Sequence, residues 1–285
     1  MPAFRFPSLR RWLPVLALAA AMTGPGTAQA SNTENWWVYV ANDNADQVRT
    51  LLAQGADPNI RYRNGQPALM RAVADDAWQV FDAIAADRRT DLNVENPAGE
   101  TPLMYLALAG QTERAAALIA RGAHVNRLGW TPLHYAASKG QVGTARLLIR
   151  HKAIVNAPSP RGVTPLMMAG FSGSREMVNL LLGAGADSTT RDLDGKNAAD
   201  WAAQGKSDRL AEDLRDVIAR AEAAREALRR APVPGGPAAG RASPAPAAPT
   251  RSGDASGKGG SPSVEPSVSG VSGVRLHDYD SDGNP

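Results

Sequence analysis

The segment between residues 32 and 230 repeats itself, and the length of the repeat restricts the fold more than any other feature of the sequence. One glycine of each unit can be aligned, and these are Gly65, Gly99, Gly129, Gly162 and Gly195, at spacings of 34, 30, 33 and 33 residues. A unit of this length cannot bury a core alone, so neighbouring units must stack on one another. The sequence therefore predicts an extended array of similar units.

Each unit carries the signals of two helices. In the segment after Gly129, Thr131 is expected to cap a helix and Pro132 to occupy its first turn. The Ala-Ala pair that follows permits close stacking, and apolar residues at i, i+3 and i+4 then predict a second, amphipathic helix. A glycine ends that helix in the left-handed conformation, and the residues up to the next aligned glycine are expected to form a β-turn finger.

This motif resembles the ankyrin repeat. The family pattern G-x-T-P-L-H-x-A-A-x-x-G matches nearly every position from Gly129 to Gly140, and residues 162–173 keep most of it. The resemblance implies an all-α ankyrin-repeat solenoid, in which helix-turn-helix units are joined by β-turn fingers. We expect a degenerate capping repeat at residues 31–60, four repeats at 61–194, and a capping repeat with an extended helix at 195–230.

The first 30 residues have the order of a secretory signal peptide. Three arginines precede an apolar stretch, and Ala28-Gln29-Ala30 predicts cleavage between Ala30 and Ser31. At about 11 residues the apolar stretch is too short to anchor the chain in a bilayer. Because the chain has no cysteine, it carries neither a lipoprotein anchor nor disulfides. These features predict a periplasmic or secreted protein without a membrane span after cleavage.

The charge balance argues against a nucleic-acid partner. The chain has 31 basic and 28 acidic residues, and the three excess arginines (Arg5, Arg10 and Arg11) all lie in the expected signal peptide. The remaining chain is electrically balanced, so it lacks the excess of cations that phosphate recognition requires.

Residues 231–285 are rich in proline, glycine, serine and alanine, and we expect a disordered tail because such a composition cannot bury enough apolar surface. Near its end, Asp278, Asp280 and Asp282 match the opening of a calcium-binding loop. The glutamate that this loop needs at its twelfth position is missing, since the sequence stops at Pro285. A solvated acidic terminus or a short docking motif is the alternative interpretation.

No pattern in the sequence indicates catalysis, a cofactor or a complete metal site. The four histidines do not have the spacing of a zinc site, and there is no G-x-S-x-G motif. The resemblance implies that His134 hydrogen-bonds the backbone between neighbouring fingers. We therefore expect a structural histidine and a protein that is not an enzyme.

The resemblance implies instead that the chain binds another protein through its finger tips and the face of the first helices. Matching the family position by position gives these candidate contact residues: Tyr62, Arg63, Glu100, Tyr105, Arg127, Trp130, Tyr135, Lys139, Arg161, Met168 and Phe171. Val163 and Asp192 are also expected to be exposed. Aromatic residues and arginines often dominate binding energy, because they bury a large area at modest entropic cost.

One finger is shorter than the others. The next aligned glycine follows six positions after Asn59, Asn93, Asn156 and Thr189, but Gly129 follows only three positions after Asn126. We interpret this as a notch in the row of fingers with Trp130 beside it. A neutral loop deletion is the alternative.

The resemblance extends to exported bacterial ankyrin proteins, and it implies a partner in the periplasm, with envelope stress or peroxide defence (support of a catalase) as one role. A secreted effector or a toxin-neutralising protein is the alternative. Residues 208–230 carry a heptad-like apolar stripe, which predicts a capping helix, with weak self-association as the alternative.

Overall fold

The computed structural model describes residues 28–230, and within this range it contains helices and one isolated β-bridge, between Arg61 and Pro67. The predicted all-α class is therefore confirmed. The predicted tail, its three aspartates and all but the last three residues of the predicted signal peptide lie outside the described residues.

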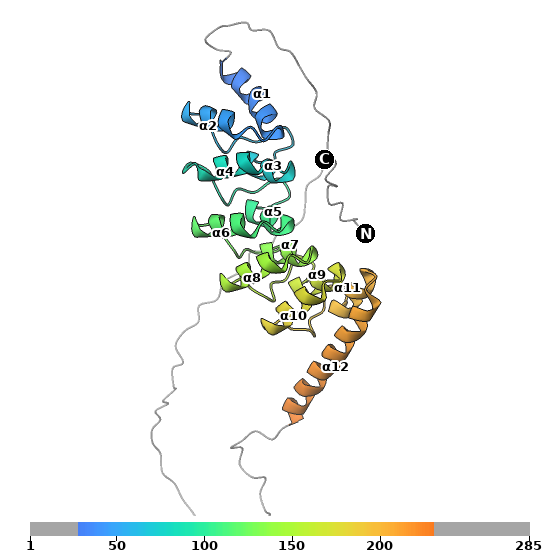
Figure 1. Cartoon of the computed structure of the whole chain (residues 1–285). Helices are drawn as coiled ribbons and strands as arrows, with labels where there is room; N and C mark the ends of the chain where they lie inside the picture. Colours follow the sequence, from blue (N-terminus) through green and yellow to red (C-terminus); the bar gives the residue numbers. More distant parts are fainter. Residues whose placement is uncertain (1–27, 231–285) are drawn as a thin grey trace, which may run out of the picture. The chain divides into compact units, whose positions relative to one another are not determined.

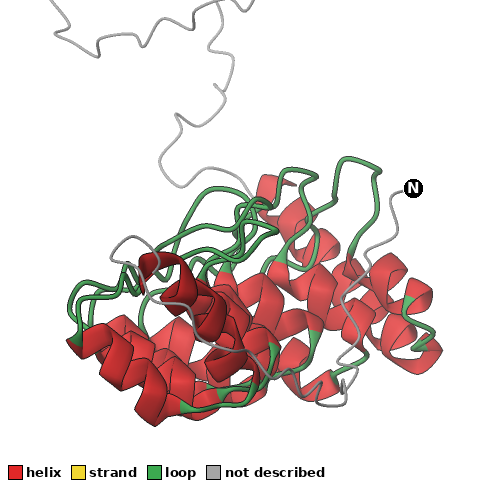
Figure 2. Cartoon of the chain, turned by 90° about the horizontal axis from the view of Figure 1, so that it is seen from above, coloured by secondary structure: helices red, strands yellow, loops and turns green. Residues whose placement is uncertain are grey.

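The helices of residues 28–230 form six consecutive pairs, and these pairs stack in two columns (Figure 1). The pairs are α1 (Ala28–Ala41) with α2 (Ala45–Ala53), α3 (Ala68–Ala74) with α4 (Trp78–Ala86), α5 (Pro102–Ala109) with α6 (Thr112–Ala120), α7 (Pro132–Ser138) with α8 (Val142–Arg150), α9 (Pro165–Ser172) with α10 (Arg175–Gly183), and α11 (Ala198–Gln204) with α12 (Asp208–Arg230). We call the odd-numbered helices inner and the others outer. The loops that lead from one pair to the next run along one side of the helices (Figure 2).

Four inner helices begin with the same hydrogen bond, although the residue that makes it changes. The backbone N–H of the capping residue donates to the third helical side chain. The acceptors are Met104 Sδ (3.4 Å), His134 Nδ1 (3.1 Å), Met167 Sδ (3.4 Å) and Asp200 Oδ2 (3.0 Å). The position thus requires an acceptor of suitable length, which satisfies an N–H that the helix itself leaves unpaired.

The inner helices also supply most of the core. The leucine of each Thr-Pro-Leu segment (Leu103, Leu133 and Leu166) is buried, and so are Ala136 and Ala137. Small residues allow backbones to approach closely, above all between α9 and α11. A Cβ atom added to Gly170 would lie 2.5 Å from the carbonyl oxygen of Ala198. At the N-terminal end, Trp36 and Val40 of α1 close the core. The α1 helix runs across the expected cleavage position between Ala30 and Ser31.

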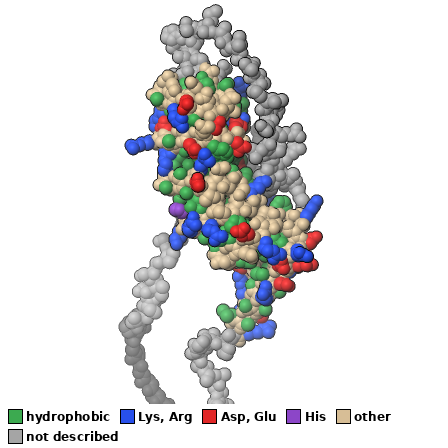
Figure 3. All heavy atoms as spheres, in the orientation of Figure 1, with side chains coloured by type: hydrophobic (Ala, Val, Ile, Leu, Met, Phe, Trp, Pro, Cys, Tyr) green, Lys and Arg blue, Asp and Glu red, His purple; other side chains and the backbone are tan. Residues whose placement is uncertain are grey.

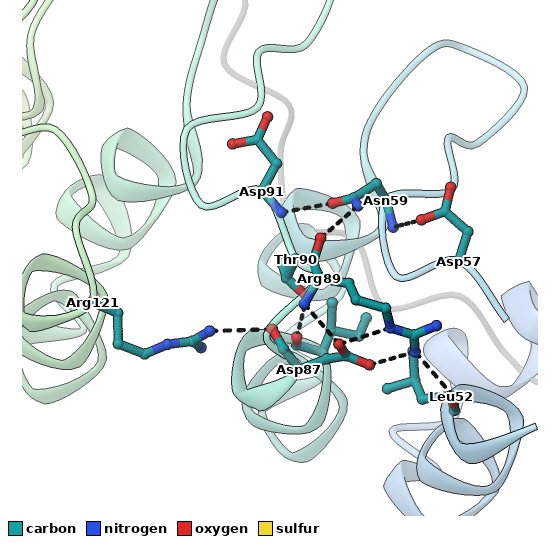
Figure 4. A network of polar contacts seen from close by, with 9 residues as sticks. Leu52, Asp57, Asn59, Asp87, Arg89, Thr90, Asp91 and Arg121 are labelled. Carbon is teal, nitrogen blue, oxygen red and sulfur yellow. Dashed lines mark hydrogen bonds and ion pairs between the residues drawn. The ribbon is translucent and has the colours of Figure 1, made fainter. Parts of the chain in front are cut away.

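Asparagine side chains connect each repeat to the next. The Asn59 amide donates to Arg89 O (2.9 Å) and its Oδ1 accepts from the N–H of Asp91 (2.8 Å), as Figure 4 shows. The same pair of bonds joins Asn93 to Gly122 O and His124 N, Asn126 to Lys152 O and Ile154 N, and Asn156 to Gly185 O and Asp187 N, all between 2.8 and 3.2 Å. We call these four side chains the asparagine ladder.

The positions of the ladder asparagines show which loop holds the extra residue of the 34-residue unit. The ladder asparagine follows the end of the outer helix by six positions in three units, for example from Ala53 to Asn59, but by seven from Ala86 to Asn93. The extra residue of the 34-residue unit therefore lies in the loop after α4. In that loop Arg89 binds Asp87 (2.6 Å) and Leu52 O (3.0 Å), while Arg121 binds Asp87 O (3.1 Å) (Figure 4). Hydrogen bonds from Arg89 hold the pKa of Asp87 below its ordinary value.

The long helix α12 closes the ladder. Leu210, Ala211, Leu214 and Ile218 bury its first turns. Farther along, the Arg225 guanidinium donates to Asp187 Oδ2 (2.8 Å) and to Thr189 Oγ1, where the ladder asparagine is replaced by threonine. Arg225 therefore attaches the later part of α12 to the last loop of the stack.

Candidate functional site

The fourth residue of each inner helix from α3 onward forms a row along the inner-helix face. The row consists of Arg71, Tyr105, Tyr135, Met168 and Trp201. Because the helices stack in register, residues at the same position of successive repeats become neighbours. The sequence predicted a binding face here, and the row brings several of its candidates together.

Glu100 joins two tyrosines in the middle of the row. Its carboxylate accepts from the Tyr135 hydroxyl (2.6 Å), the Tyr105 hydroxyl (3.1 Å) and Asn96 Nδ2 (2.7 Å). Tyr105 belongs to the same repeat as Glu100, whereas Tyr135 belongs to the next. Burial, reinforced by Glu100, raises the pKa of Tyr105 to about 12 and also raises the pKa of Tyr135. Both hydroxyls therefore stay protonated at neutral pH and hold the carboxylate in place.

Aromatic side chains continue the row toward both ends. At the N-terminal end the Trp37 ring meets the edge of Tyr62 (centroids 5.0 Å apart), and the Arg71 guanidinium lies over the Tyr62 ring (4.8 Å). At the C-terminal end Phe171 and Trp201 pack edge to face, with centroids 6.0 Å apart. Phe171 is 42% exposed, so the predicted contact position is accessible.

Three positions expected to be exposed are buried. Met168 is only 7% exposed, since α9 and α11 approach each other closely and Met168 packs into the core. Val163 precedes the α9 cap and is buried as well. Asp192 Oδ1 accepts two backbone N–H groups of its finger, and Oδ2 accepts from Trp201 Nε1 (2.9 Å). These hydrogen bonds fix the conformation of the finger, so the Asp192 carboxylate does not serve as a contact for a partner.

Two of the predicted arginines connect neighbouring fingers. Arg127 Nη2 binds Glu95 Oε1 (2.8 Å), and its Nη1 donates to Gly99 O. Arg161 binds both carboxylate oxygens of Asp194 (2.8 and 2.9 Å). These arginines therefore hold the fingers together. Arg63 and Lys139, two further predicted contact residues, are exposed as well.

The short finger presents an apolar side chain that the sequence reasoning did not select. Leu128 is 95% exposed, next to the half-buried Trp130, whose ring meets the edge of His134 (centroids 5.2 Å apart). A leucine at the tip of the one shortened finger was the signal that could have identified it. A second finger leucine, Leu193, is 76% exposed.

His134 is a structural residue. Because Nδ1 accepts the N–H of Thr131, Nε2 carries the proton and donates to Val163 O of the next repeat (2.9 Å). Burial lowers the pKa of His134 to about 4, although the backbone hydrogen bond opposes this shift. The neutral imidazole thus links two repeats, as the resemblance implied.

Within residues 28–230, no cluster of three or more histidine and acidic side chains is arranged to hold a metal ion. No helix in the described part of the chain is long and apolar enough to cross a membrane.

A comparison with protein-family models supports the observed order of helices and fingers. The model of ankyrin repeats, which spans three copies, matches residues 36–128, 76–159 and 124–192, and together these ranges cover more than half of the chain. The chain belongs to the ankyrin repeat family. Ankyrin repeat proteins are generally non-catalytic scaffolds that bind other proteins.

The relatives that match this chain do so over part of its length. The chain is similar to the Neurogenic locus Notch protein of Drosophila melanogaster (40% identity over 72 residues, 24% of this chain and 3% of the relative). It is also similar to the human Neurogenic locus notch homolog protein 2 (36% over 101 residues, 35% and 4%) and to the rat Ankyrin repeat and SAM domain-containing protein 6 (30% over 161 residues, 54% and 15%). The chain thus spans a small part of each relative's length.

The lowered pKa of His134 predicts a specific pH dependence of stability. Between about pH 6.5 and pH 4 the unfolded ankyrin stack binds a proton that the folded stack excludes, so this contribution is complete above pH 6.5 and is lost as the pH falls. His134→Met retains an acceptor for Thr131, as Met104 and Met167 do in their repeats. We expect wild type to lose roughly 2 kcal/mol more than this variant between pH 7 and pH 5 in urea unfolding.

The matched control is His151→Gln, since His151 is exposed at the end of α8. It should follow the wild-type profile. Equal losses in wild type and His134→Met would contradict the assignment of a buried neutral imidazole.

Proposed function

We propose that this ankyrin repeat protein binds its protein partner through the finger tips and the inner-helix face, centred on the short finger at residues 127–129. The observation that carries the proposal is the 95% exposure of Leu128 on a finger three residues shorter than its neighbours. Full burial of such an apolar side chain by a partner contributes about 1.5 to 3 kcal/mol, which exceeds the rotamer entropy that a leucine loses.

The backbone that presents Leu128 is already ordered. Arg127 ties it to the preceding finger through Glu95 and Gly99. On the other side, a Cβ atom added to Gly129 would lie 3.5 Å from the ring of Pro160 in the following finger. A partner therefore does not have to order this loop when it binds, which favours affinity.

The surroundings of the short finger match those of interaction hot spots. Trp130 follows Leu128 in sequence, and Glu100 with Tyr135 lies on the adjoining inner-helix face. Half-buried aromatic rings held in fixed positions offer contact area at low entropic cost. The aromatic pair Phe171 and Trp201 extends this surface toward the C-terminal repeat.

Replacement of Leu128 tests the position of the binding surface. Leu128→Ser should weaken retention of the partner about tenfold in affinity capture followed by quantitative mass spectrometry, since loss of one buried leucine contact corresponds to at least 1.4 kcal/mol. Leu193→Ser is the matched control, because Leu193 is also an exposed finger leucine. Equal losses in both variants, or no loss in either, would contradict a surface centred on the short finger.

The proposal includes export of the chain, with a partner in the periplasm or outside the cell. The arginines, the apolar stretch and the Ala28-Gln29-Ala30 segment of residues 1–30 support it. Envelope stress or peroxide defence is the role we propose for that compartment. A secreted effector or a toxin-neutralising protein is the alternative, and the identity of the captured partner separates the two.

Export predicts a defined N-terminus. The protein recovered from the periplasm of a bacterial host should have the intact mass of a chain that begins at Ser31, because cleavage follows the last alanine of the A-x-A segment. Ala30→Leu should block this processing. Recovery of the uncleaved chain from the cytoplasm alone would exclude the export proposal.

A further inference from the structure

We propose that the first residues of the loops after the outer helices α4, α6 and α8 (residues 87–91, 121–124 and 151–154) form a second binding site, distinct from the finger tips, for an extended acidic peptide segment of a partner protein. The side chains concerned are Arg88, Arg121, His124, Arg150, His151 and Lys152. We call them the basic strip. All six are exposed, and basic side chains gather over the end of α8 in Figure 3.

The asparagine ladder brings these loops side by side. Asn93 binds Gly122 O and His124 N, and Asn126 binds Lys152 O and Ile154 N, so each loop is fixed to the one before it. Arg121 also reaches back to Asp87 O (3.1 Å). The cations of three repeats therefore occupy neighbouring, ordered loops although they are far apart in sequence.

Few carboxylates neutralise the strip. Within residues 87–91, 121–124 and 151–154 there are two acidic residues, of which Asp87 is paired with Arg89 (2.6 Å) and Asp91 is the other. Arg146, which is exposed one turn earlier on α8, adds to the positive charge. Such an excess on one small surface attracts anions even though the chain as a whole is nearly balanced.

The basic strip is bounded by an acidic residue on each side. Asp57 lies in the equivalent loop of the preceding repeat, and Asp187, which is bound to Arg225, lies in the equivalent loop of the following repeat. Three stacked loops at a helix spacing of about 10 Å extend over roughly 20 Å, the length of about six extended residues. The strip is therefore matched to a short linear anion.

The chemistry of the strip favours a carboxylate-rich peptide. Guanidinium groups bind carboxylates through paired hydrogen bonds. A broad anionic membrane surface would also meet Asp57 and Asp91, and within residues 87–91, 121–124 and 151–154 the one exposed large apolar side chain that it could bury is Ile154 (55% exposed). A peptide can place its acidic residues between these carboxylates and an apolar residue on Ile154.

Binding of fluorescein-labelled hexaglutamate to the full chain, followed by fluorescence anisotropy at low salt, tests the proposal. Arg150→Gln combined with Lys152→Asn removes two cations, and asparagine suits the left-handed backbone of position 152 (φ 65°). We expect this variant to bind about five- to tenfold more weakly, as two exposed ion pairs allow. Binding to wild type should also weaken as salt is added.

The control variant is Arg209→Gln combined with Arg215→Gln, which removes the same charge from exposed positions of α12. It should bind hexaglutamate like wild type. Equal weakening in both double variants, or no binding by wild type, would overturn the proposal. Tighter binding to phosphatidylglycerol vesicles or to a short oligothymidylate than to hexaglutamate would also overturn it, because the strip would then serve another class of partner.

Discussion

The ankyrin stack depends on an asparagine side chain that uses both ends of its amide on the next repeat. Asn59, Asn93, Asn126 and Asn156 each donate to a carbonyl oxygen and accept an N–H from a single loop. In a solenoid each repeat contacts only its neighbours, so such interfaces are the unit of stability. The amide fixes the register between two loops because a shift in either direction would break both bonds. Where threonine replaces the asparagine, at Thr189, Arg225 of α12 takes over.

The fixed register between the loops determines where the short finger and the basic strip lie. The loop after α4 has one additional residue, and the finger after Asn126 has three fewer than the others. Neither change disturbs the ladder, because both lie between one pair of asparagine hydrogen bonds and the next. The short finger can therefore expose Leu128 without disturbing the helices. The same hydrogen bonds hold Arg121 beside the loop of Lys152. The proposed recognition surface at the short finger and the basic strip along the loops both derive from the repeat spacing.

Much of this architecture was predictable from sequence, because the repeat is a local pattern. The glycine spacing and the Thr-Pro-Leu segment predicted the helix pairs, and His134 was correctly expected to bind backbone between repeats. The errors concern contacts between repeats. Met168 was expected to be exposed like Tyr105 and Tyr135 at the same position, but Gly170 lets α11 approach and bury it. Neither the role of Asp192 under Trp201 nor that of Arg225 has a local signal, since each depends on a residue in another element.

Native-state hydrogen exchange tests the central role of the ladder most directly. The amides of Asp91, His124, Ile154 and Asp187 lie in surface loops, so without the ladder they would exchange at nearly the rate of an unfolded chain. We expect each to be protected at least about tenfold, and we expect Asn93→Ala to remove protection at His124 while Asn64→Ala, which affects a bond within one finger, leaves it intact. Unprotected loop amides in wild type, or protection of His124 that persists in Asn93→Ala, would contradict the account.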